Sequence, residues 1–274
     1  MTKKNHYLLI APFFIVVCLF LLLPMLFVLI DSFKTEQDVW SISNYIEIFS
    51  NPFYTQSFGN SLDIAFKSML IGLGISLLSA HAIHSSGKRL GKIALTVTNM
   101  ASNFSGVPLA FAFMIILGNN GVITILFKHL GFDLISIFNL YSKIGLIVVY
   151  VYFQIPLGIL LLYPAFDRIE GSYKEAAFTL GAGKWVFWKR IGLPLLFPSL
   201  LSTSVILFAN AIGAYATAYA LTSGAFNLVP VRIGTLVSGD IFLKPNMASA
   251  LSVILASILL ALNTIGRRRL HEES

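Results

Sequence analysis

The chain has 274 residues, of which 57% are hydrophobic and only 11% are charged, with a mean hydropathy of +0.82. A soluble domain carries about 25% charged residues, so the composition excludes the soluble globular class and indicates an integral membrane protein. The single cysteine, Cys18, lies in an apolar run, which excludes a disulfide and a cysteine-based metal site.

Six segments have the length and composition of membrane-spanning helices, which need about 20 mostly apolar residues. The first, at 7–31, is longer than the apolar part of a signal peptide and has no small-residue cleavage site, so we expect a retained span. The others are expected at 61–84, 93–117, 143–165, 196–221 and 247–266. The sequence therefore predicts an all-α membrane protein with six transmembrane helices in one transmembrane domain, residues 1–274. The external loops are expected at 32–58, 118–142 and 222–246, and each is too short to form a further domain.

The cations of the connecting segments gather on one side of this topology. They lie at the N-terminus, after the second span, in the loop at 166–195 and at the C-terminus. Because cytoplasmic loops carry the excess of Lys and Arg, this bias predicts that both termini are cytoplasmic. The net charge of +7 is then explained by a basic face towards anionic lipid, and nucleic acid is not expected as a partner.

The loop at 166–195 is unusually polar for this chain, and we expect two short helices in it. Ser172 is a candidate N-cap, and Glu175 follows it at the spacing of a capping box. Gly181 permits a turn between the two helices, and Pro194 is expected to end the second one.

Trp185 and Trp188 stand three residues apart in this loop, so a helix would place them on one face, flanked by Lys184 and Lys189. An aromatic face with a polar rim fits a docking surface for another protein. It fits a helix lying in the membrane interface equally well. The residues alone leave both interpretations open.

The same loop contains a spaced motif that resembles a known family. The pattern EAA-x3-G-x9-I-x-LP is matched in full by Glu175, Ala176, Ala177, Gly181, Ile191, Leu193 and Pro194. It resembles the signature loop of the permease subunits of binding-protein-dependent type I ABC importers, and it precedes the second-last span, as in that family. Segments at 59–66, 103–121 and 208–224 are similar to the polyamine, ferric iron, thiamine and phosphonate branch. The likeness extends from residue 55 to the end, with 61–266 as the core of the permease.

The resemblance implies a function and a set of partners. The motif loop would be a coupling helix that fits a groove in a cytoplasmic ATPase, present in two copies. A second, related permease and an extracytoplasmic substrate-binding protein would complete the importer in a bacterial-type inner membrane. The solute would be small and polar, with a polyamine such as spermidine or putrescine as the first expectation and ferric iron, thiamine or phosphonate as alternatives.

ATP hydrolysis is not expected in this chain, because GAGKW at 181–185 lacks the spacing and the hydroxyl residue of a phosphate-binding loop. The chain is therefore predicted not to be an enzyme, and no cofactor is implied. Two other function classes are an intramembrane enzyme, for which no convergent catalytic groups stand out, and a stand-alone ion-coupled carrier. The carrier would need a membrane-embedded acid, and Asp63 is the only candidate.

Polar side chains inside the expected spans are candidates for the translocation pathway, because such groups are unfavourable in lipid. They are Asn103, Gln154, Asn210 and Tyr215, with Asn99 close by. Hydrogen bonding between helices is the alternative for each. Prolines within VPLAF at 107–111 and QIPLG at 154–158 predict either broken helices that line a substrate site or simple packing kinks.

Two charged or titratable pairs lie in the second span. Asp63 and Lys67 have the spacing of an ion pair on one helix face, as a self-neutralised pair or as part of an external gate or docking rim. His81 and His84 lie near the other end without a nearby Cys or acid cluster in sequence, so we expect a headgroup-level position and no metal site.

Overall fold

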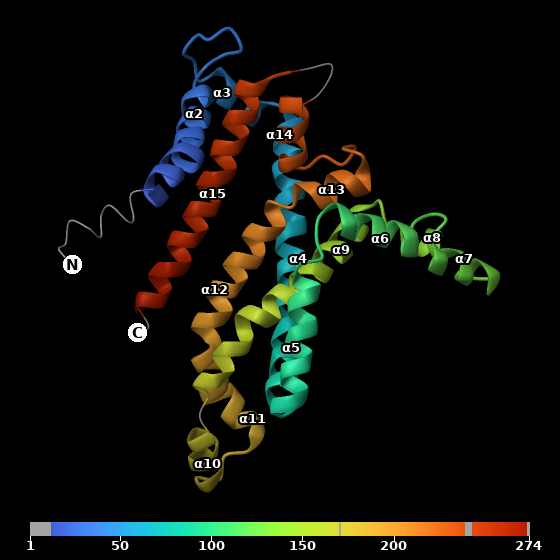
Figure 1. Ribbon diagram of the computed structural model, residues 1–274, viewed down its shortest axis with the longest axis vertical. Helices are drawn as coiled ribbons and strands as arrows, with labels where there is room; N and C mark the ends of the chain where they lie inside the picture. The colour runs from blue at the N-terminus through green and yellow to red at the C-terminus, as the bar shows by residue number, and fades with distance from the viewer. Residues whose placement is uncertain (1–11, 170, 239–242, 273–274) are drawn as a thin grey trace, which may run out of the picture. The chain divides into compact units, whose positions relative to one another are not determined.

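The computed structural model describes residues 12–169, 171–238 and 243–272, and most of these residues are helical (Figure 1). Within these ranges there is no β-strand, and only an isolated bridge links Lys34 and Trp40. Six of the described helical segments are long and apolar enough to cross a membrane, which confirms the predicted fold class. They are Pro12–Ser32, Pro52–Ser85, Val107–His129, Lys143–Arg168, Lys184–Ile212 and Pro245–Thr264.

The chain divides into two compact units. The first contains Met1–Phe58 and Asn227–Leu259. Its described helices are α2 (Leu23–Ser32), α3 (Ser43–Ser50), α14 (Val229–Ser238) and the beginnings of α4 and α15. Its core is formed by Ile48, Tyr54, Met247, Ala250 and Leu251. The hydroxyl of Tyr45 also donates a hydrogen bond to Ser32 Oγ over 2.8 Å, which ties α3 to the end of the first span.

The second unit contains Gly59–Phe226 and Leu260–Ser274. Its long helices are α4 (Pro52–Ser85), α5 (Lys88–Ser102), α9 (Lys143–Leu162) and α12 (Leu193–Ile212); the last helix, α15 (Pro245–Glu272), ends in it. Helix α9 packs against both α5 and α12 (Figure 1). The close approach of α9 to α4 depends on Gly158, because a Cβ there would lie 2.8 Å from Ser76 Cβ. This packing of small residues is typical of helices in membranes.

The prediction for the third span at 93–117 was wrong in its boundaries. The structure ends α5 at Ser102 and begins α6 (Val107–Leu117) after a break of four residues. Gly106 within the break has φ of +72°, which a residue with a Cβ adopts at a cost. Pro108 stands in the first turn of α6, where its missing N–H is not needed. It therefore starts a helix rather than interrupting one.

The fifth span also differs from the expectation of 196–221. Helix α12 ends at Ile212, and α13 (Tyr215–Thr222) begins after Gly213 and Ala214. The segment expected as a loop at 118–142 contains two further short helices, α7 (Val122–His129) and α8 (Leu134–Ile137), and α7 belongs to the third spanning segment, Val107–His129. The single transmembrane domain over residues 1–274 stays a prediction.

Candidate functional site

The loop that carries the sequence motif lies between α9 and α12. A 3-10 turn, Tyr163–Arg168, continues α9, and α10 (Gly171–Thr179) follows. Because α10 begins at Gly171, Ser172 lies within its first turn, and the prediction of Ser172 as the N-cap was wrong. Glu175 lies in the middle of α10 with its side chain exposed.

The spacing between the EAA residues and Gly181 has a backbone explanation. Gly181 has φ of +79° and stands at the left-handed position that closes α10. The Gly181 N–H bonds to Phe178 O over 3.0 Å, and the Ala182 N–H bonds to Ala177 O over 3.0 Å. These two bonds make a Schellman motif, which satisfies carbonyls at the helix end. This hydrogen-bond pattern requires the left-handed residue, Gly181, to stand four residues after Ala177, which is the spacing found in the sequence motif.

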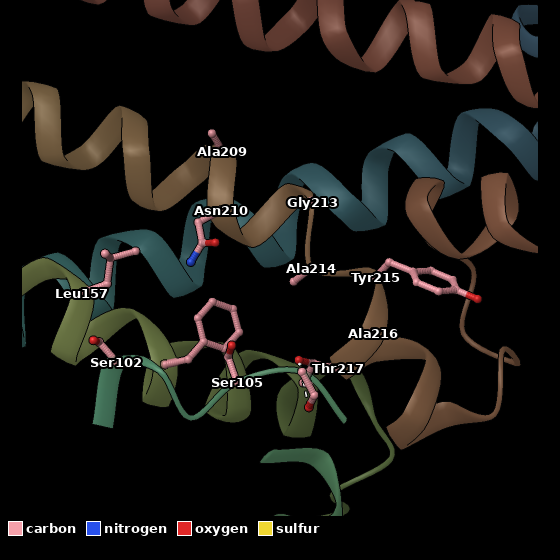
Figure 2. Close-up of a pocket in the computed structure, with 12 residues that line it drawn as sticks. Ser102, Ser105, Leu157, Ala209, Asn210, Gly213, Ala214, Tyr215, Ala216 and Thr217 are labelled. Atoms are coloured by element: carbon pink, nitrogen blue, oxygen red, sulfur yellow. Dashed lines mark hydrogen bonds between the residues drawn. The ribbon is translucent and has the colours of Figure 1, made fainter. Parts of the chain in front are cut away.

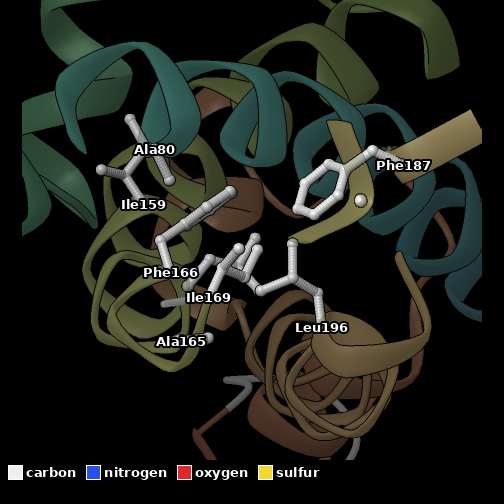
Figure 3. Close-up of a cluster of buried hydrophobic side chains, with 9 residues drawn as sticks. Ala80, Ile159, Ala165, Phe166, Ile169, Phe187 and Leu196 are labelled. Atoms are coloured by element: carbon white, nitrogen blue, oxygen red, sulfur yellow. The ribbon is translucent and has the colours of Figure 1, made fainter. Parts of the chain in front are cut away.

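Ala177 also packs inward, whereas its neighbours Glu175 and Ala176 are exposed. It belongs to a buried apolar cluster at the base of the loop, contributed by α4, by α9 and the 3-10 turn that continues it, by Ile169, by α10, by Phe187 and by α12 (Figure 3). In the close-up, Phe166, Ile169 and Leu196 converge at the centre of this cluster. Because its small side chain is enclosed, a bulkier residue at Ala177 would have to displace the base of α10.

Ile191, Leu193 and Pro194 end the motif, and they lie at the start of the fifth span. Pro194 was predicted to end a helix, but no helix ends there. One continuous helical segment runs through α11 (Lys184–Phe187), a π-helical turn at Trp188–Gly192 and α12. The Leu193 N–H bonds to Trp188 O, the wider pattern of a π turn. Such a turn relieves the clash between a proline ring and the carbonyl four residues before it.

Two apolar side chains of the loop face outward. Leu180 is 87% exposed and Trp185 is 77% exposed. Trp188 instead packs against the buried cluster, with its ring centroid 4.8 Å from that of His81. The expectation that Trp185 and Trp188 share one face was therefore wrong. An exposed apolar tip on a buried base is an arrangement typical of a docking surface.

His81 and His84 lie beside the base of this loop. The His81 ring stacks on Phe166, and His84 Nε2 lies 3.1 Å from Asp167 Oδ1. No group of three or more His, Cys, Asp or Glu side chains in the described part of the chain could hold a metal ion. The two histidines pack the end of α4 against the loop.

A second candidate site is a cavity of about 640 Å³ where two helix breaks meet. Its wall includes Gly106 from the break before α6, and Gly213 and Ala214 from the break before α13. The Thr217 hydroxyl donates to Gly106 O over 3.4 Å, which links the two breaks. The Tyr150 hydroxyl donates a hydrogen bond to the carbonyl oxygen of Ala214 over 2.9 Å. Irregular backbone at membrane depth is tolerated where it lines such a cavity.

Two of the four predicted pathway residues, Asn210 and Tyr215, line this cavity. Figure 2 shows the Asn210 amide pointing into the space bounded by Leu157, Ser105 and Thr217, whereas the Tyr215 ring points away from Asn210. Among the described residues of the wall, none is charged. Sequence reasoning missed Ser102, Ser105 and Thr217, whose hydroxyls are ordinary in a helix and become notable only at the breaks.

The other two predicted residues lie outside the wall. Gln154 is fully buried between α9 and α4, where its Nε2 donates to Ser68 Oγ over 2.8 Å. Its Oε1 has no hydrogen-bond partner among the described residues. Asn103 caps α5 next to the cavity, and its Nδ2 donates to Asn99 O over 2.8 Å. For Gln154 the bond between helices therefore fits better than a pathway role.

The charged pair of the second span has a third member. Asp63 Oδ2 lies 2.9 Å from Lys67 Nζ and 2.8 Å from Lys143 Nζ. Lys143 is the first residue of α9, so the carboxylate links the first half of α4 to the start of α9. The sequence could not show this contact, because Lys143 is remote from Asp63 in the chain.

Comparison with known proteins identifies the family. The family model described as binding-protein-dependent transport system inner membrane component matches residues 72–268, more than half of the chain. The chain belongs to this family. It is a multi-pass permease subunit of the type I ABC importer kind, which confirms the resemblance seen in the motif loop.

Individual relatives of this permease differ in their solutes. The spermidine/putrescine permease PotB of Haemophilus influenzae is 27% identical over 251 residues, which cover 89% of this chain and 86% of PotB. A probable sulfate permease, cysT of Marchantia polymorpha, is 26% identical over 207 residues, covering 74% and 67%. A bacterial alginate ABC transporter, crystallised with its alginate-bound periplasmic protein, has the same fold at 19% identity, with a TM-score of 0.77 and coverage of 96% and 93%.

Proposed function

We propose that this permease moves a small polar solute into the cytoplasm, driven by ATP hydrolysis in separate subunits that dock on the loop between α9 and α12. The observation that carries the proposal is the loop itself. Glu175, Gly181 and Pro194 keep the full spacing of the family signature, and Leu180 and Trp185 expose apolar surface at its tip. The coupling residues are Glu175, Ala176, Ala177, Gly181, Ile191, Leu193 and Pro194.

The motif residues have distinct tasks in this proposal. Glu175 presents a carboxylate on the exposed side of α10, where it can bond a backbone amide or a cation of the ATPase. Ala176 keeps that side slim enough to enter a groove. Ala177 and Gly181 hold the shape of the turn, while Ile191 packs on the buried cluster and transmits movement of α10 to α12. This division separates residues that touch the partner from residues that position the loop.

The complete importer would contain two ATPase subunits, this permease with a second, related permease, and an extracytoplasmic binding protein. The family description and the alginate transporter with its periplasmic protein support partners of this kind. The loop and both termini would be cytoplasmic, as the distribution of cations favours. In this scheme the chain makes and breaks no bond, and the cavity at the helix breaks is part of the pathway, with Asn210 and Tyr215 in its wall.

The first candidate solute is a polyamine, because PotB aligns over most of both chains. An uncharged wall can receive an ammonium group through hydroxyl, amide and carbonyl oxygens. A small oxyanion is the second candidate, supported by the sulfate permease relative. Hydroxyl and amide groups donate hydrogen bonds to an anion as readily as they accept them from a cation.

Reconstitution tests this proposal. The permease is purified with its ATPase, second permease and binding protein, and uptake of radiolabelled spermidine, putrescine and sulfate into proteoliposomes is measured. ATP-dependent uptake of one solute, which requires the binding protein, is expected. Uptake by the permease alone, driven by an ion gradient without ATP, would instead support the stand-alone carrier.

A further inference from the structure

Helix α5 has three different faces, although it is a single helix of 15 residues. One face packs along α9, as Figure 1 shows. At its beginning, Gly91 comes so close to the end of α4 that an added Cβ would lie 3.2 Å from Ile83 O. At its end, Ser102 lines the cavity together with Leu157 of α9. The helix therefore runs from the loop end of the second unit to the cavity.

The second face of α5 is a polar stripe. Its members follow one another at intervals of three and four residues, which places them on one side of a helix. All are exposed, and they are Arg89, Lys92, Thr96, Asn99 and Asn103. The Thr96 hydroxyl donates to Lys92 O over 2.9 Å, and the Asn103 amide donates to Asn99 O over 2.8 Å. Both bonds stay within the helix, so neither side chain is used in packing another element.

The third face is an apolar stripe with the same spacing. Leu90, Ile93, Val97 and Met100 are all more than half exposed. Helix α5 is not itself one of the six candidate spanning segments, but it packs along α9, which is part of one, so both stripes run beside a membrane-spanning helix. The apolar stripe suits lipid or another apolar helix. The polar stripe does not suit lipid, where exposed amide, hydroxyl and cationic groups are strongly unfavourable.

We propose that the polar stripe of α5 lines the water-filled half of the pathway between the cavity and the cytoplasm, and that Arg89 and Lys92 form a basic exit. This inference rests on the proposed function, because it uses the cytoplasmic position of the loop. Continuity supports it: the stripe ends at Asn103, next to Ser102 and Ser105 in the cavity wall. Its order places neutral groups near the cavity and cations near the mouth, and a mouth of this charge suits the oxyanion candidate better than a polyamine.

The exit has a testable electrostatic property. A residue on the stripe one turn from Lys92 lies about 6 Å from it, and in water one charge at that distance changes the local concentration of a singly charged reagent about threefold. Reagents of opposite charge should therefore differ about tenfold in their rate at Thr96. The difference is largest at low ionic strength, because salt screens exposed charges.

Thiol labelling of the whole reconstituted importer tests the proposal. Cys18 is first replaced by Ser, and single cysteines are placed at Thr96 and Asn99 on the polar stripe. Val97→Cys and Met100→Cys on the apolar stripe of the same helix are matched controls. The probes are an anionic and a cationic methanethiosulfonate, applied from the loop side, with and without nucleotide trapping of the ATPase.

We expect Thr96→Cys and Asn99→Cys to react at least tenfold faster than the two controls, and to become protected when nucleotide closes the loop side. The anionic reagent should be the faster at Thr96→Cys, and Lys92→Gln should remove most of that preference. Equal reaction of all four cysteines, or protection of all four in every nucleotide state, would overturn the proposal. If ATP-driven uptake persists in that case, the pathway lining is wrong while the proposed function stands; loss of ATP-driven uptake in the parent complex refutes the function itself.

Discussion

Gly181 offers the sharpest test of the loop, because its role is set by the backbone alone. Its φ is +79°, and an added Cβ would meet no atom within 4 Å. The cost of Gly181→Ala is therefore conformational rather than steric, about 1–2 kcal/mol for a left-handed L-residue. A free energy of this size reduces the population of the correctly closed loop by a factor of about 5–30. We expect solute uptake and solute-stimulated ATPase activity to fall together, while membrane insertion is unchanged.

Two further variants separate this explanation from others. Gly181→Asn should lose much less uptake and ATPase activity than Gly181→Ala, since Asn tolerates the left-handed region better than Ala. Gly183→Ala is the matched control: it is two residues away, it also has open space, and its φ is −74°, which Ala adopts freely. Amide hydrogen exchange at residues 181 and 182 gives a direct readout, because both amides close the Schellman motif. If Asn were as harmful as Ala, a collision with the ATPase rather than backbone strain would be the cause, and the reasoning would be refuted.

Three further predictions concern the packing of the second unit. Gly158→Ala should lower the free energy of unfolding by about 1–3 kcal/mol, because its Cβ would meet Ser76, and Ser76→Gly should restore much of the loss in detergent thermal melts. Gln154→Leu should change stability by less than about 1.5 kcal/mol and keep uptake, since it removes one hydrogen bond together with an unpaired buried oxygen. Lys143→Met should cost only a small and salt-dependent part of the stability, because Asp63 keeps a second lysine partner and is partly exposed.

Each of these has a contrary outcome. Gly74→Ala is the control for Gly158→Ala. A Cβ at Gly74 would meet nothing within 4 Å, so this variant should change stability very little. Loss of transport without loss of stability in Gln154→Leu would return that residue to the pathway. A large loss of stability for Lys143→Met that does not depend on salt would mean that the ion pair is desolvated in the native state.

The sequence predicted six spanning segments because hydrophobic length is a local property, but the third, expected at 93–117, lies at Val107–His129. The motif loop could also be located, since seven fixed positions occur in one stretch. The break before α6 was anticipated only as one of the two alternatives for VPLAF, and the break before α13 was missed, because the residues at both places lie inside apolar runs whose average hydropathy hides them. Pro108 and Pro194 were both expected to interrupt a helix. Pro108 instead stands in the first turn of α6, and the π turn before Pro194 lets the helix continue past it.

The contacts of the candidate site depend on tertiary structure, and no local pattern reveals them. Gln154 was predicted to face the pathway, but its partner is Ser68 on another helix. The polar stripe of α5 was visible only in part, through Asn99 and Asn103. Its cationic members were assigned to a loop, because the sequence does not show that the helix begins at Lys88.

The most direct test of the central claim is to purify the complex from native membranes through this permease and to measure ATPase activity. Wild type should bring down a nucleotide-binding subunit whose hydrolysis is stimulated by a solute-loaded binding protein. Glu175→Ala, on the exposed face of α10, should keep the permease intact but lose that stimulation. A permease that purifies in folded form without any ATPase, in a detergent that preserves related importers, would contradict the account.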